Sequence, residues 1–435
     1  MKTEQLERIP AESDRKQSEP NPVSSSVQVQ PAALCAPDFI SDYADWADVF
    51  EAPRKAHEWV ACQLVASALN GKVFIPWGGA TYSLDLWVLL LSGSGQGRST
   101  LTGVAHEVVE EADLDKLIHK AAWGSRQAFF QQMAESPEGM YDWPELSIVQ
   151  QTLNDPKFGG TKEWITDRYD NPRIPPPLRY RSTGRSNDTP PIVFDKAPRI
   201  NILATSSTDW FINGLEQADT TGGFIPRFLL VSLGRQERLL PKPLPLDKTA
   251  LPALGKRLEE ISKIKGNADL SAVEPMYDDW YRSAYARFTK QSNPSLSLPF
   301  FNRLRGMVLK LAVIFEVSAS GSLQVSSASM QRAIEAALDV ERTIFEILPT
   351  GMSHEGSELE KMAEYIRSGG PDGKSQSQIT YAFKYWKRRD REDRLNTLVE
   401  SGTVECFVKK TTGRPAQIYV HVDYIKESHA ASPKG

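Results

Sequence analysis

The stretch LDLWVLLLSGSGQGRST, residues 84–100, decides the fold that the sequence predicts. Its first half is almost wholly apolar, which is typical of a strand in a parallel sheet that helices cover on both faces. Its second half is rich in glycine and runs into RSTLTGVAHEVVEEA, a segment with helical composition. A buried strand, a glycine-rich turn and a helix are therefore expected here in succession.

The glycine-rich turn resembles a phosphate-binding loop, whose pattern is G-x-x-x-x-G-K-[ST]. Ser92 stands in place of the first glycine, and Arg98 stands in place of the lysine. In such a loop backbone N–H groups approach the phosphates, a cation reaches them, and a hydroxyl binds Mg²⁺. The residues expected to bind ATP in this way are Gly93, Gly95, Gly97, Arg98, Ser99 and Thr100. The alternative is a glycine turn that binds no nucleotide.

Composition and length narrow the class of protein. A chain of 435 residues, 40% hydrophobic and 24% charged, is ordinary for a soluble globular protein with two or three folded units. The longest apolar run, residues 86–91, is far shorter than the roughly 20 residues that span a bilayer. The first 30 residues lack the apolar segment of a signal peptide. We therefore expect a cytoplasmic protein without a membrane partner.

The pattern along the chain predicts an α/β core followed by helices and a small C-terminal unit. Residues 38–71 predict one amphipathic helix, and RINILATSSTDWFINGL and GGFIPRFLLVSL each contain an apolar strand. Strands that alternate with helices favour a parallel sheet. The segments expected are a disordered tail (1–36), the α/β core (37–249), a helical subdomain (250–348), a linker (349–357), a winged-helix-like unit (358–425) and a second disordered tail (426–435).

A carboxylate suited to hydrolysis follows another short apolar stretch, GMYDWPELS. Glu145 could orient the attacking water, and Asp142 could support Mg²⁺. Pro144 occupies the position where an aspartate would be expected beside the glutamate. The alternative for Glu145 is a surface residue that begins a helix after this proline.

Two further positions predict contacts with a nucleotide. Ser206 lies among the hydroxyl residues that end a buried strand, where it could sense the terminal phosphate; simple capping of the next helix by Ser207 or Thr208 is the alternative. Arg227 enters an apolar strand and could act as an arginine finger toward a neighbouring subunit. A structural salt bridge is the alternative for this arginine.

These segments together resemble the RecA-like P-loop ATPases of phages, plasmids and integrated elements, a group often classified only as a domain of unknown function and often found with, or fused to, primases. The resemblance covers about residues 38–345. It rests on LDLWVLLLSGSGQGRST, WPELSIVQQTLNDPKFGGTKEWITDRYDNP, ILATSSTDWFINGLEQADTTGGFIPRFLLV and RLRGMVLKLAVIFEVS.

The resemblance implies a RecA-like P-loop fold, a phosphate loop at residues 93–100, a catalytic carboxylate at Glu145, a sensor hydroxyl at Ser206 and an arginine finger at Arg227. It also implies a homo-oligomer, either a hexamer-type ring or a filament, and a primase as a further partner. The departures at Arg98 and Pro144 bear on turnover more than on the fold.

The C-terminal unit is locally basic, with ten Lys or Arg against five Asp or Glu between Lys374 and Arg414. Such a unit can bind the DNA backbone, either single-stranded or duplex. The residues expected to do so are Lys384, Lys387, Arg388, Arg391 and Arg394 on one helix and Lys409, Lys410 and Arg414 on a β wing. Tyr381, Tyr385 and Trp386 are expected in the core, and stacking on nucleobases is the alternative for them. The alternative is a solvated charged helix.

The function expected is therefore that of a DNA-associated ATPase that uses ATP and Mg²⁺, either a replicative helicase or a helicase loader of a mobile genetic element. The alternative is a DNA-binding replication initiator or regulator that keeps the P-loop fold and hydrolyses ATP poorly or not at all. Arg98 and Pro144 motivate this second reading.

Overall fold

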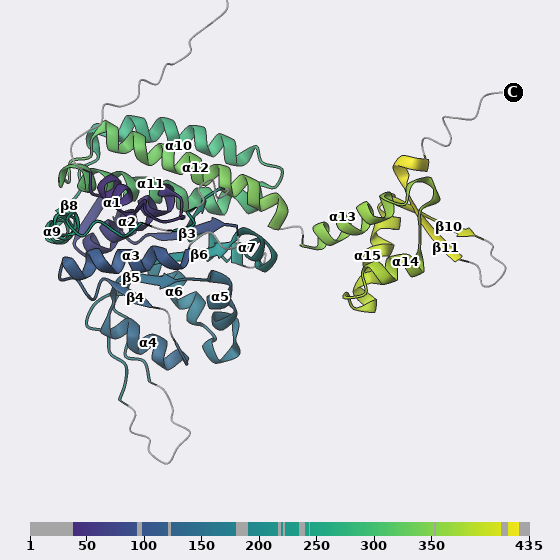
Figure 1. Ribbon diagram of the computed structural model, residues 1–435, viewed down its shortest axis with the longest axis horizontal. Coiled ribbons are helices and arrows are strands. Elements are labelled where there is room, and N and C mark those ends of the chain that lie inside the picture. The colour runs from purple at the N-terminus through teal and green to yellow at the C-terminus, as the bar shows by residue number, and fades with distance from the viewer. Residues whose placement is uncertain are drawn as a thin grey trace, which may run out of the picture. The chain divides into compact units, whose positions relative to one another are not determined.

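Buried apolar residues of the protein form two separate groups, one between residues 39 and 348 and one between residues 362 and 419. Figure 1 labels helices and strands of both groups. The computed structural model describes residues 38–93, 98–120, 123–179, 190–215, 219–220, 222–234, 240–242, 244–351, 354–409 and 416–425.

A five-stranded sheet lies at the centre of the first group. Its strands, in order across the sheet, are β4 (Ile118–Lys120), β5 (Glu138–Trp143), β6 (Arg199–Ser207), β3 (Trp87–Ser92) and β7 (Phe228–Ser232). Every neighbouring pair is parallel. All six residues of β3 are buried, because the strand has a neighbour on each side and helices on its faces. The predicted α/β class with a parallel sheet is confirmed.

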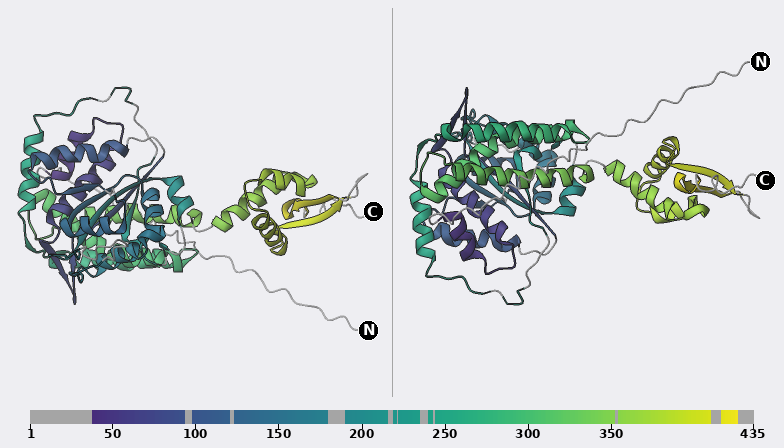
Figure 2. Two further views of the ribbon diagram at one scale, coloured as in Figure 1. Left: turned by 90° about the horizontal axis from the view of Figure 1, so that it is seen from below. Right: turned by 90° about the horizontal axis from the view of Figure 1, so that it is seen from above.

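Helices cover the sheet and continue its core. On the sheet lie α2 (Arg54–Leu69), α5 (Leu146–Asn154) and α6 (Thr161–Asp170), while α9 (Leu251–Ser262) packs against α3 (Arg98–Glu111). Three long helices pack together, as Figures 1 and 2 show: α10 (Glu274–Thr289), α11 (Pro294–Ser320) and α12 (Ser327–Gly351). Of these, α12 packs against β7. The predicted helices between residues 250 and 348 are confirmed, and they share one buried core with the sheet.

The start of the first group differs from the prediction. Residues 38–71 form two helices, α1 (Phe39–Ala47) and α2, rather than one amphipathic helix. Thirteen of the 16 residues of α2 are buried, so its apolar positions mark a helix enclosed on nearly all sides. The predicted stop is confirmed, because Gly71 follows the helix with a φ of 72°.

The apolar segment after α2 belongs to a second, smaller sheet. Its strand β1 (Val73–Trp77) pairs antiparallel with β2 (Ala80–Ser83) and parallel with β8 (Gly266–Asn267). The described residues of the first group also form the α-helices α4 (Arg126–Glu135) and α7 (Thr208–Gly214). Between α6 and β6, the described residues form one isolated antiparallel bridge, between Leu178 and Ile192.

The second group has its own small core. Its elements are α13 (His354–Arg367), β9 (Lys374–Ser375), α14 (Gln376–Ala382), α15 (Arg388–Glu400), β10 (Val404–Lys409) and β11 (Ala416–His421). The strands form an antiparallel sheet in the order β10-β11-β9. Helices with a two-stranded β wing were expected here. The linker expected at residues 349–357 is mostly helical, because α12 extends to Gly351 and α13 begins at His354.

Within the described ranges no helix combines the length and the apolar composition that crossing a bilayer requires. The longest helix, α11, has 27 residues but carries Arg303, Arg305, Lys310 and Glu316.

His57 on α2 makes stability depend on pH. The side chain is fully buried, and neither ring nitrogen has a hydrogen-bond partner among the described residues. Burial lowers the pKa of His57 to about 4. Because an unfolded histidine titrates near 6.5, protons bind the unfolded chain more tightly, and stability falls as pH drops from about 6.5 to about 4.

We predict that His57→Leu removes up to about 3 kcal/mol of this pH dependence, because the neutral side chain does not titrate. Urea unfolding of both proteins at intervals from pH 7 to pH 4.5 measures the effect. As pH falls, the free energy of unfolding should decrease more for wild type than for His57→Leu. Parallel curves would show that His57 is protonated equally in both states.

Candidate functional site

The carboxyl ends of β3, β5 and β6 lie side by side at one edge of the main sheet. The register pairs Ser92 of β3 with Ser207 of β6, and Trp143 of β5 with Ala204 of β6. Glu145 follows Trp143 by two residues, and Ser206 follows Ala204 by two residues. Glu145 and Ser206 therefore lie side by side at the carboxyl ends of their strands. Gly93 begins the glycine loop next to them.

Glu145 and Ser206 contact each other directly. The Ser206 hydroxyl donates to Glu145 Oε1 at 2.6 Å, and the Ser147 backbone N–H donates to the same oxygen at 3.4 Å. Ser147 Oγ lies 3.3 Å from Ser206 Oγ. Glu145 is half-buried and is also the N-cap of α5. The glutamate therefore begins a helix, as the alternative held, and is at the same time held by a hydroxyl of the neighbouring strand.

The hydroxyl residues that end β6 have different tasks. Ser207 Oγ accepts from the Trp210 backbone N–H at 3.3 Å and caps α7, so capping does not use Ser206. Thr205 Oγ1 donates to the carbonyl of Pro144, which ties β6 to the end of β5. Thr208 Oγ1 donates to the Ser92 carbonyl at 3.5 Å, which ties it to the end of β3.

The glycine loop runs from β3 to α3. Gly93 and Thr100 are described and exposed, and α3 begins at Arg98, as predicted. Gly95 and Gly97 lie outside the described residues, as do the side chains of Arg98 and Ser99. Their contacts with a nucleotide stay predictions. The helix N-terminus itself points backbone N–H groups and a partial positive charge toward the loop.

Asp142 lies behind the first turns of α3. It is 5% exposed and accepts a hydrogen bond from Thr102. Burial raises the pKa of Asp142, while Thr102 and the charge of His106 oppose the rise. Ser99 and Thr102 share a helix face at i, i+3. A role for Asp142 at Mg²⁺ stays a prediction, and in the described part of the chain no three or more His, Cys, Asp or Glu residues gather to hold a metal.

Arg227 lies at the opposite, amino edge of the sheet. It ends the turn before β7, and the next residue, Phe228, pairs with Trp87 at the start of β3. Its side chain is 5% exposed and forms an ion pair with Asp170. It also donates to the Gly223 carbonyl. Burial lowers the pKa of Arg227, and Asp170 acts against this effect. The salt bridge that was the alternative to an arginine finger is therefore present.

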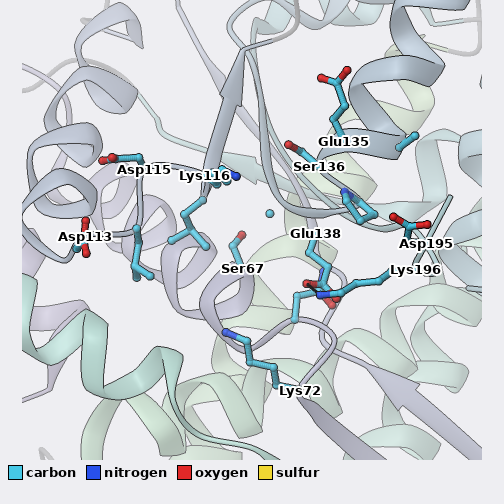
Figure 3. A pocket seen from close by; sticks show the side chains of 16 residues that line it. Ser67, Lys72, Asp113, Asp115, Lys116, Glu135, Ser136, Glu138, Asp195 and Lys196 are labelled. Carbon is cyan, nitrogen blue, oxygen red and sulfur yellow. Dashed lines mark hydrogen bonds and ion pairs between the residues drawn. The ribbon is translucent and has the colours of Figure 1, made fainter. Parts of the chain in front are cut away.

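Two cavities also open near the amino edge. One, of about 600 Å³, is lined by the first residues of β5 and by side chains of both charges, with Lys196 Nζ 3.2 Å from Glu138 Oε2 (Figure 3). The other, of about 350 Å³, is lined by Arg303, Lys310 and the Asp170 that pairs with Arg227. Neither cavity is lined by Glu145 or Ser206.

The second group arranges its basic residues differently from the prediction of one basic helical face. The chain turns between α14 and α15, so Lys384 lies in the turn and Lys387 precedes α15. Arg391 donates to the carbonyls of Phe383 and Trp386, both at 3.3 Å. The Arg394 guanidinium lies 5.0 Å from the centre of the Trp386 ring. These two arginines therefore stabilise the turn.

Arg388, by contrast, is exposed and pairs with Glu392 at 2.8 Å. The side chain of Lys409, together with Lys410 and Arg414, lies outside the described residues. Trp386 is partly buried and packs against Phe383 and the small core, whereas Tyr381 and Tyr385 are exposed, which corrects the expectation that they belong to the core.

Sequence reasoning missed Thr102, Ser147 and Asp170. A signal for Thr102 exists, because it lies one helical turn after Ser99. Ser147 could have been found as the second residue after an N-cap. Asp170 lies 57 residues from Arg227, and no local pattern links the two.

No protein-family model matches this chain, and a search of curated proteins gives no match.

We predict that Arg227→Ala lowers the free energy of unfolding by about 2 to 3 kcal/mol, because it removes a buried side chain together with its ion pair to Asp170. Arg303→Ala is the matched control: Arg303 pairs with the same Asp170 at 3.2 Å, but its side chain is 36% exposed. Its loss should cost less than about 1 kcal/mol. Denaturant unfolding measures both, and equal losses would contradict a structural role specific to Arg227.

Proposed function

We propose that this chain is a RecA-like P-loop ATPase that acts on DNA as a replicative helicase or helicase loader. The observation that supports this most strongly is the 2.6 Å hydrogen bond from Ser206 to Glu145 beside the loop that follows β3. A fixed carboxylate near a glycine loop and a helix N-terminus suits phosphoanhydride hydrolysis. The role in a mobile element rests on the resemblance of the sequence motifs alone.

The strand order supports a ligand at this edge. In open parallel sheets, ligands bind outside the carboxyl ends of the strands, at the point where the strand order reverses. After β3, the chain forms β4 at the far edge of the sheet and then β5 and β6, which approach β3 from that side. The next strand, β7, lies on the other side of β3. The reversal is therefore at β3, the strand that leads into the glycine loop.

The chemistry assigned to each group follows from its position. The N-terminus of α3 and the loop amides would bind the phosphates of ATP. Glu145 would orient the attacking water, and Ser206 holds that carboxylate in place. Mg²⁺, which neutralises phosphate charge, would be held by the hydroxyl of Ser99 or Thr100 with support from Asp142, a donor set of oxygen atoms that suits this ion.

A second candidate is a DNA-binding initiator or regulator that binds ATP with little turnover. The environment of Asp142 favours it, because this carboxyl is buried, bound to Thr102 and has a raised pKa. Pro144 supplies no carboxylate beside Glu145. Both candidate functions require ATP binding, but only the first requires rapid ATP hydrolysis.

We predict that Glu145→Gln lowers steady-state ATP hydrolysis by at least about 100-fold and changes ATP affinity by less than about 3-fold, because the amide cannot accept a proton from water. Hydrolysis is measured with and without DNA, and affinity is measured separately by equilibrium binding. The matched control is Glu163→Gln, an exposed carboxylate in the first turn of α6, which should leave both unchanged.

Wild-type protein that binds ATP without turnover, with or without DNA, would exclude the ATPase and leave the second candidate. Absence of ATP binding would exclude both.

DNA binding is assigned to the second group. Lys384 and Lys387 have no carboxylate partner among the described residues and are exposed, so they can bind phosphates. We predict that Lys384→Ala/Lys387→Ala weakens binding to single-stranded and duplex DNA alike and reduces the slope of log K against log salt by about 2.

Fluorescence anisotropy at several salt concentrations measures this slope. Lys361→Ala, at an exposed lysine of α13, is the matched control. A slope unchanged in the double variant would show that these lysines do not contact DNA phosphates.

A further inference from the structure

Two tyrosines beside the turn between α14 and α15 are unusually exposed. Tyr381 is 75% exposed and Tyr385 is 87% exposed. The other two aromatic residues of this segment, Phe383 and Trp386, are partly buried against the small core, and their ring centres lie 4.4 Å apart. Aromatic side chains that lie together on a surface and take no part in the core indicate a binding site.

A cation joins these two rings into one surface. Lys384 Nζ lies 5.3 Å from the Tyr381 ring centre and 5.1 Å from the Tyr385 ring centre. We call Tyr381, Lys384 and Tyr385 the tyrosine platform. Contact with both rings places the ammonium between two flat apolar surfaces.

The residues that follow the platform are basic and exposed. Lys387 has no carboxylate partner among the described residues. Arg389 is 92% exposed, with its acidic neighbour Asp393 at 3.8 Å. The platform therefore combines ring faces with positive charge, which complements a ligand that has flat bases and phosphates.

We propose that the tyrosine platform is a binding site for unpaired nucleobases of single-stranded nucleic acid. Base stacking on aromatic side chains requires an open base face, and in a duplex the neighbouring base pairs cover that face. Lys384 and Lys387 bind the adjoining phosphates. This inference rests on the proposed DNA binding and adds a preference for single strands to it.

The test compares binding of the full-length protein to an oligothymidylate and to a duplex of equal length. Tyr385→Ala and Tyr381→Ala should each weaken single-strand affinity by about 5- to 100-fold and duplex affinity by less than about 2-fold, with an unchanged salt slope. Tyr385→Phe and Tyr381→Phe should bind like wild type, because stacking needs the ring and not the hydroxyl. The fluorescence of an oligonucleotide that contains 2-aminopurine should fall on binding to wild type and to the phenylalanine variants, which keep the ring. It should not fall with the alanine variants, which lack it.

Tyr285→Ala is the matched control, since this tyrosine is 50% exposed on α10. Thermal unfolding confirms that each variant is folded. Equal single-strand affinity in the alanine variants and wild type would overturn the inference while leaving DNA binding intact. Loss of affinity in the phenylalanine variants would overturn it in favour of a hydroxyl–phosphate contact. DNA binding absent from wild type, with self-association lost in the alanine variants, would overturn both proposals and indicate a second copy as the occupant.

Discussion

The burial of β3 is the constraint on which the rest of the first group depends. Its six residues are enclosed by β6 and β7 at its edges and by helices on its faces. A strand with no exposed side can end only where the chain reaches the surface, and here it ends in glycines. Because the flanking strands are parallel to β3, their carboxyl ends reach the same edge. Glu145 and Ser206 meet there although 61 residues separate them.

The sequence predicted those parts of the site that depend on local patterns. The apolar runs of β3, β6 and β7 are long enough to identify, and each strand ends in a serine at its carboxyl end. The strand β4 has three residues, Ile118–Lys120, too few for any periodicity, and its place at the sheet edge could not be predicted. The hydrogen bond between Glu145 and Ser206 depends on β6 lying next to β5, which is a property of the strand order and not of either segment.

In the second group, a turn between two helices makes the prediction of one continuous basic helix wrong. Counting by 3.6 residues from Lys384 to Arg394 assumes one helix, but the chain turns after Ala382 and α15 begins at Arg388. The turn directs Phe383 and Trp386 inward and leaves Tyr381 and Tyr385 outside. Arg391 and Arg394 then stabilise the turn, so the charge available to a ligand lies nearer the tyrosines than the sequence suggested.

The positions of Glu145 and Arg227 link two parts of the proposed function. Arg227 lies next to the first residue of β3, and Gly93 follows the last residue of the same strand. The full length of β3 therefore separates Arg227 from the glycine loop. At about 3.3 Å per residue, a strand of six residues is about 20 Å long, which an arginine side chain cannot cross. Arg227 therefore cannot complete the nucleotide site of its own chain. An arginine-finger role would therefore require a second copy of the chain and release of Arg227 from Asp170.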